Sequence, residues 1–109
     1  MWARLNRWQV PADDVDTGVE GVRTYLVEEA VPEVRERPGY LGSYSFVERE
    51  AGQGITISFW DSEEHLRASE ANAARQRREG SERVGGEEAG MTRLEVIHSD
   101  TFELPHSEG

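Results

Sequence analysis

Residues 40–60 have the sequence YLGSYSFVEREAGQGITISFW and predict a β-hairpin. The first part, 40–48, is rich in aromatic and alternating residues, as strands are. Residues 50–54 are a short connection with glycines, of the length that joins two antiparallel strands. The second strand, 55–60, alternates two sets of side chains on its two faces: Ile55, Ile57 and Phe59 on one, and Thr56, Ser58 and Trp60 on the other.

The sequence before this hairpin predicts a strand followed by a helix. Residues 2–10 have the mixed apolar and polar composition of a strand. Residues 15–37 place apolar side chains three or four positions apart along one helical stripe: Val15, Val19, Val22, Leu26, Ala30 and Val34. We expect Pro32 to kink this helix or to begin its last turn, and Pro38-Gly39 to end it.

The sequence after the hairpin predicts a second helix and a last strand. A capping side chain followed by carboxylates begins a helix over 61–79. Residues 80–90 contain four glycines and no apolar pattern, and so predict a loop. Residues 91–104 alternate as a strand and close a domain that we place at 1–104, and 105–109 form a C-terminal tail.

The predicted order of elements is β-α-β-β-α-β. This order is typical of the ferredoxin-like α+β fold, a four-stranded antiparallel sheet with two helices on one face. The other face of such a sheet would be apolar and uncovered. We therefore expect a homodimer in which two sheets stack face to face, as in a dimeric α+β barrel.

Composition limits the partners and the chemistry. The chain has 12 basic and 22 acidic residues in 109, a net charge of −10 that disfavours nucleic acid and anionic membranes. It has no cysteine, so thiolate metal sites and thiol nucleophiles are excluded. The first residues have no secretory apolar region, and no apolar run is long enough to span a membrane. We expect a cytoplasmic protein.

Two motifs resemble a known family. RPGYLG at 37–42 resembles the PGF-G segment of antibiotic-biosynthesis-monooxygenase-like (ABM) domains, and SFWDSEE at 58–64 resembles their W-x-S-x-E junction between strand and helix. The order of elements matches this family from residue 1 to about residue 104. The resemblance implies the dimeric α+β barrel. The family includes cofactor-free quinol oxygenases, haem degraders and signal-processing enzymes, so it leaves the activity open.

The residues that define two branches of the family are only partly present. The haem-degrading branch has an asparagine in the first strand, which Asn6 matches. Its helical tryptophan falls on Ser69, and the region of its axial histidine, 74–78, reads ARQRR, so the resemblance implies no haem chemistry here. The cofactor-free monooxygenase branch is matched at Trp60, whereas Thr56 and Leu66 replace its asparagine and tyrosine.

Three residues are candidates for catalysis. Trp60 either packs between sheet and helix or offers its indole N–H and ring to a ligand. Asn6 is either bonded to the backbone or directed into a cavity. His98 shares its predicted strand face with Leu94 and Val96, and is either a hydrogen-bonded structural residue or an acid–base group.

Three aromatic residues are candidates for ligand binding. Tyr44 and Phe46 share one predicted strand face and could line a cavity, and Trp8 lies on the same strand face as Asn6. The arginines at 75, 77 and 78 either clamp an anion at the mouth of a pocket or form a solvated helix end. The spacing of the three histidines matches no metal site, so we predict none.

These residues favour an enzyme-like function. The preferred hypothesis is a cofactor-free monooxygenase that holds a small aromatic or apolar molecule between sheet and helices, without metal or flavin. One alternative is a non-catalytic binding or sensing module on the same dimeric scaffold. Another is an interaction protein whose pocket is filled by its own side chains and whose acidic outer surface carries the function.

Overall fold

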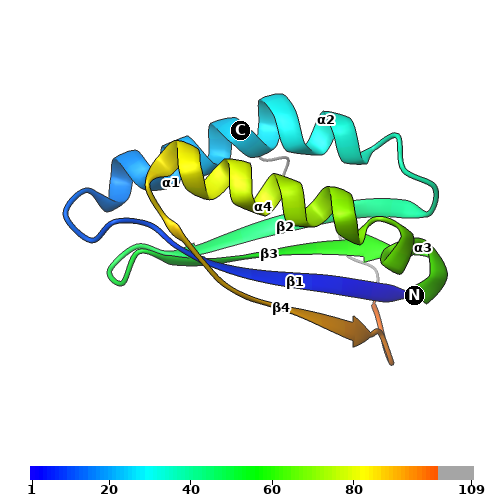
Figure 1. Ribbon diagram of the computed structural model, residues 1–109. Helices are drawn as coiled ribbons and strands as arrows, with labels where there is room; N and C mark the ends of the chain where they lie inside the picture. Colours follow the sequence, from blue (N-terminus) through cyan, green and yellow to red (C-terminus); the bar gives the residue numbers. More distant parts are fainter. Residues whose placement is uncertain (101–109) are drawn as a thin grey trace.

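The computed structural model describes residues 1–100, which form a sheet covered on one side by helices (Figure 1). The strands are β1 (Trp2–Gln9), β2 (Tyr40–Glu48), β3 (Gln53–Trp60) and β4 (Glu87–Glu95). The helices are α1 (Val15–Tyr25), the π-helical turn η1 (Leu26–Ala30), α2 (Val31–Val34), α3 (Glu63–Ala68) and α4 (Glu70–Val84). No helix within residues 1–100 has the length and hydropathy needed to cross a membrane.

The four strands form one antiparallel sheet in the order β2-β3-β1-β4. This confirms the predicted ferredoxin-like arrangement, with the hairpin β2–β3 at one edge and the last strand at the other. In Figure 1, the helices α1, α2 and α4 lie on the same side of the sheet, and no helix covers the opposite side. The register pairs Asn6 of β1 with Thr56 of β3, so these two side chains share a face.

The covered face of the sheet is unusually polar for a core. On β1 this face carries Arg4, Asn6 and Trp8. The register pairs these residues with Ser58, Thr56 and Gly54 of β3, respectively. Trp60 and Leu66, near the passage from β3 to α3, are fully buried, and Val10 and Val19 are buried near the start of α1. The space above the middle of the sheet is therefore bounded below by polar groups.

The uncovered face of the sheet is apolar. The register aligns Tyr44, Ile57 and Leu5 in one row across three strands. Tyr44 and Phe46 are 42% and 51% exposed in the single chain. We call this surface the open face. Its apolar side chains include Leu5, Tyr44, Phe46, Ile55, Ile57, Phe59 and Leu94.

The first helical segment contains a π-helical turn. Asp14 caps α1 by accepting from the Thr17 amide, and α-helical bonding lasts to Tyr25. The five residues of η1 follow, and α2 then begins with Pro32 in its first turn. The prediction that Pro32 begins the last turn is confirmed, because a proline ring is tolerated there. π-Turns are frequent at functional sites, and η1 lies over the polar part of the sheet.

The predicted loop at 80–90 is wrong. α4 continues to Val84, Gly85 ends it with φ of +67°, and β4 begins at Glu87. The glycines serve close packing instead, since a Cβ on Gly80 would lie 3.2 Å from the Tyr25 ring. β4 therefore starts before the predicted strand at 91 and ends at Glu95. Residues 101–104 of that predicted strand and the tail, 105–109, lie outside the described residues.

Gly54 allows the Trp8 ring to lie against the sheet, which leads to a testable prediction. A Cβ on Gly54 would lie 2.0 Å from Cζ2 of Trp8. We expect Gly54→Ala to destabilise the fold by about 1–3 kcal/mol, because the indole must leave its place and its bond to Thr56. Urea unfolding measures the change. In a Trp8→Ala background the same substitution should cost much less, and an equal cost would contradict the assigned contact.

Candidate functional site

A cavity of about 130 Å³ lies between the sheet and the helices. The helical side is largely apolar and includes Val22, Leu26, Ala30, Val31, Val34 and Val84. The sheet side is polar and includes Arg4, Asn6, Ser43, Thr56 and Ser58, with Trp8 beside them. An apolar wall facing a few polar groups is the usual construction of a small-molecule site.

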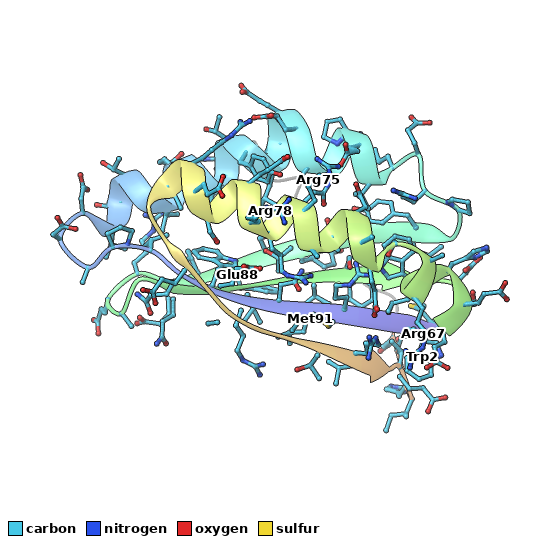
Figure 2. All side chains as sticks on the ribbon, in the orientation of Figure 1. Trp2, Arg67, Arg75, Arg78, Glu88 and Met91 are labelled. Atoms are coloured by element: carbon cyan, nitrogen blue, oxygen red, sulfur yellow. The ribbon has the colours of Figure 1, made fainter. Side chains whose placement is uncertain are left out.

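Asn6 and Arg77 meet at the polar side of the cavity. Nη1 of Arg77 donates to Oδ1 of Asn6 at 3.3 Å, and Nε of Arg77 donates to Oε1 of Glu88 at 3.2 Å. The side chain of Arg77 is 22% exposed, so it is held inward from α4. Figure 2 shows Glu88 at the beginning of β4, below α4. In this orientation the Asn6 amide nitrogen is left to donate to a ligand.

Hydroxyl groups continue the polar surface across the sheet. Nε1 of Trp8 donates to Oγ1 of Thr56 at 3.2 Å, and Thr56 also shares a hydrogen bond with Ser45 at 2.9 Å. The Tyr40 hydroxyl donates to Ser43 at 2.9 Å. These groups can donate or accept, so they can hydrogen-bond a ligand oxygen in either protonation state.

Arg4 is the most buried charged group at the site. It is 2% exposed, and its Nη2 donates to the Leu66 carbonyl oxygen at 2.8 Å and to Ser69 Oγ at 2.7 Å. Its guanidinium lies over the Trp60 ring, 5.5 Å from the centroid. Burial lowers the pKa of Arg4 to about 10, because desolvation disfavours the charged form.

Trp60 packs beneath the site rather than in it. Its side chain is 0% exposed, its Nε1 donates to Ser58 Oγ at 3.0 Å, and its ring meets Tyr40 edge-on at 5.5 Å. It does not line the cavity. Of the two alternatives for Trp60, the geometry favours packing.

Tyr44 and Phe46 do not reach the cavity, because they lie on the open face. Their rings are 6.3 Å apart, and Tyr44 meets Phe59 edge-on at 6.3 Å. The reason is a bulge at Leu41. Tyr40 pairs with Trp60 and Gly42 pairs with the next residue of β3, Phe59, so Leu41 has no partner across the two strands. Tyr40 therefore lies on the covered face, whereas alternation after the bulge places Ser43 and Ser45 on the covered face and Tyr44 and Phe46 on the open face.

His98 is also absent from the cavity lining. It lies three residues beyond the end of β4 and is exposed. The predicted face shared by Leu94 and His98 does not form, because the strand ends before residue 98. Of the predicted site residues, the structure brings together Asn6 and Trp8 at the cavity.

Sequence reasoning missed Arg4 and did not separate Arg77 from the arginines beside it. Strand alternation already placed Arg4 on the same face as Asn6 and Trp8, but no acidic residue in the sequence pattern indicated that Arg4 would be buried. Arg77 belonged to a basic run whose members the helix separates. Arg77 faces the cavity, Arg78 is exposed, and Arg75 bonds Glu33 of α2 and Glu79. Figure 2 labels Arg75 and Arg78 on α4.

The residues at this site do not fit haem. No histidine of the described chain lines the cavity, and His65 is exposed and bonded to Asp61 at 2.7 Å. The position of the family's helical tryptophan is Ser69, whose hydroxyl accepts a hydrogen bond from Arg4 and donates one to the Leu66 carbonyl oxygen. Within residues 1–100, no three His, Asp or Glu side chains come together as a metal site would require.

The structure is similar to solved structures over most of its length. A Streptomyces coelicolor monooxygenase from the gene ActVA-Orf6, in complex with nanaomycin D, matches with a TM-score of 0.68 and 13% identity, covering 94% of this chain and 92% of that one. The heme-degrader MhuD of Mycobacterium tuberculosis, with two hemes in its active site, matches at 0.64 and 20%, covering 93% and 100%.

A dimeric ferredoxin-like protein from an uncultured marine organism matches with a TM-score of 0.68 and 9% identity, covering 94% of this chain and 100% of that one. No protein-family model matches the sequence, and no curated protein matches it. Each of these three matches covers at least 93% of this chain. The chain therefore shares the fold of these proteins, the ferredoxin-like arrangement of one four-stranded sheet and its helices.

Proposed function

We propose that this chain binds a small oxygen-substituted aromatic molecule in the cavity and oxidises it with molecular oxygen, as a cofactor-independent monooxygenase. The observation that carries the proposal is the cavity itself, with apolar helical side chains opposite Asn6 and the hydroxyls of the sheet, and with Arg77 reaching in from α4. The wall suits the face of an aromatic ring, and the polar side suits its oxygen substituents. The similar fold of a ligand-bound monooxygenase supports the same reading.

The volume limits the size of the ligand. An apolar protein cavity of roughly 150 Å³ binds benzene. The cavity here measures about 130 Å³ and extends to a polar side, so it suits one ring or two fused rings with polar substituents. A porphyrin would require the helices to separate from the sheet.

The proposed reaction needs no electron donor besides the substrate. A phenol loses two hydrogen atoms and gains one oxygen atom to become a quinone, while the second oxygen atom of O₂ leaves as water. The phenol is oxidised and O₂ is reduced, with atoms and electrons in balance. The ionised phenolate is the better electron donor, so a group that stabilises the phenolate oxygen accelerates the reaction.

Arg77 and Asn6 are the groups that can stabilise this oxygen. A guanidinium close to a phenol lowers the pKa of the phenol by favouring its charged form. The free Asn6 amide adds a hydrogen bond to the same oxygen. Tyr25 also lines the cavity, but burial raises its pKa to about 12, so it stays protonated. The catalytic roles predicted for Trp60 and His98 remain predictions, and neither residue lines the cavity.

A homodimer is part of this proposal. The open face exposes a row of apolar and aromatic side chains of the kind that partners cover. A two-fold axis through this row would place Tyr44, Ile57 and Leu5 of one protomer against the same residues of its partner. The fold is shared with a dimeric ferredoxin-like protein, which supports this arrangement.

Ligand binding without turnover is a second candidate function. One observation favours it. Among the described residues that line the cavity there is no histidine to remove a proton, and of the two lining carboxylates, Glu87 and Glu88, that of Glu88 is engaged by Arg77. A sensing module needs only the cavity and its hydrogen bonds.

The test compares two neighbouring arginines of α4. With 2-naphthol as the probe, we expect a dose-dependent rise in Tm and oxygen uptake with incorporation of labelled oxygen into the product. Arg77→Ala should lower kcat/KM by about 10- to 100-fold, the value of a hydrogen bond to a charged group. Arg78→Ala removes the same charge one position on, where the side chain is exposed, and should change little.

The outcomes separate the two candidates. A rise in Tm without oxygen uptake would identify a binding module. Equal losses in Arg77→Ala and Arg78→Ala would show that net charge, and not the cavity, accounts for the effect. No rise in Tm with naphthols, hydroxyquinones or phenols would contradict both functions.

A further inference from the structure

Arg4 is a buried cation without an ionic partner in the described chain. Both of its hydrogen bonds come from Nη2 and go to neutral oxygens, the Leu66 carbonyl and Ser69 Oγ. Its Nε is buried with no hydrogen-bond partner. Buried charges are normally paired, because an ion taken out of water loses its solvation energy.

The carboxylate of Glu70, which acts on Arg4, is already paired with Arg93. This carboxylate raises the pKa of Arg4, but it receives two hydrogen bonds from Arg93. The charges of Arg77 and Arg93 act on Arg4 in the opposite sense. The ring of Trp60 compensates in part, since a guanidinium over an aromatic face is attracted to it.

The cavity is positive inside a negative protein. Its lining contains three arginines and two glutamates, which leaves a net charge of +1: Arg4, Arg7, Arg77, Glu87 and Glu88. The whole chain carries −10. In this acidic domain the most buried cation, Arg4, lies at the wall of the cavity.

From this geometry we infer that the ligand carries a carboxylate, which pairs with Arg4 while its hydroxyl meets Asn6 and Arg77. The inference rests on the proposed function and narrows its substrate class to hydroxylated aromatic carboxylates. Arg4 and Asn6 are two residues apart on one strand, about 7 Å, which is close to the span of a ring substituted at opposite ends. The fork of an arginine matches a carboxylate.

The test uses a matched pair of probes on the intact protein. We expect 6-hydroxy-2-naphthoate to bind at least about tenfold more tightly than 6-hydroxy-2-naphthamide, because a charge-assisted bond replaces a neutral one. The two compounds share the ring and the hydroxyl and differ only in charge. Fluorescence of the naphthol and NMR titration both give Kd.

Arg4→Met removes the charge and keeps the length of the side chain. The fold should tolerate it, because the Leu66 carbonyl keeps its bonds from the Ser69 amide and hydroxyl. Replacing an unpaired buried ion by an apolar side chain is often neutral or stabilising. We therefore expect an unchanged or higher Tm, together with loss of the preference for the carboxylate. Arg67→Met, at an exposed residue of α3, is the control and should keep that preference.

Each outcome decides the inference. A carboxylate preference that disappears in Arg4→Met and persists in Arg67→Met supports it. Equal affinity for the naphthoate and the naphthamide in the wild type overturns it, even if 2-naphthol still binds and the proposed function stands. Failure of all three probes to bind overturns the inference and the proposed function together. A preference unaffected by Arg4→Met overturns the assignment to Arg4.

Discussion

Replacing Trp60 by alanine is expected to lower the free energy of unfolding by about 3–5 kcal/mol, the usual cost of truncating a buried aromatic side chain. Trp60 is fully buried at the end of β3. Its ring touches Tyr40 and supports the guanidinium of Arg4, and its indole nitrogen bonds Ser58. The alanine variant therefore loses apolar burial, two ring contacts and one hydrogen bond. Urea unfolding followed by circular dichroism measures the loss.

Two further variants separate packing from catalysis. Trp60→Phe keeps an apolar ring in the same place and should cost less than the alanine variant, and it should still bind 2-naphthol. Trp2 of β1 pairs with Trp60 of β3 and is only partly buried. Trp2→Ala should therefore lower the free energy of unfolding by less than Trp60→Ala does. If Trp60→Phe kept full stability but lost all turnover, the indole N–H would have the catalytic role predicted from the sequence.

The fold was predictable because its main elements depend on local patterns. Alternation defined β2 and β3, and the helical stripe from Val15 to Val34 defined the first helical segment. The glycines between 80 and 90 misled the prediction for a physical reason. Gly80 is tolerated within α4 because the Tyr25 ring occupies the space of a side chain, and this contact lies 55 positions away along the sequence.

The site was less predictable because it depends on register. Asn6 and Trp8 were placed correctly, since strand alternation needs no partner. Tyr44 and Phe46 were misplaced because a single bulge at Leu41 inverts the faces of β2, and nothing in the local sequence of β2 indicates which residue bulges. Arg77 could be separated from Arg78 only when the direction of α4 relative to the sheet was known.

Ile57→Asp is expected to separate the proposed dimer into monomers. Ile57 lies in the middle row of the open face, between Tyr44 and Leu5. In a monomer the introduced carboxylate would be solvated, because this face is uncovered. In a face-to-face dimer, symmetry would bury two copies of the carboxylate close together without counter-charges. We expect the dimer Kd to rise by at least about 1,000-fold, equivalent to about 4 kcal/mol.

The control keeps the chemistry of the substitution and changes its location. Val27→Asp introduces the same carboxylate at an apolar side chain that is 46% exposed on the helical layer, away from the open face. Analytical ultracentrifugation should find dimers for Val27→Asp and monomers for Ile57→Asp, with the same circular dichroism for both. If Ile57→Asp stayed dimeric, the protomers would associate through another surface.

The monomeric variant also shows whether the site is complete within one protomer, because the cavity is on the other side of the sheet. Unchanged affinity for 2-naphthol would place every essential contact in a single chain.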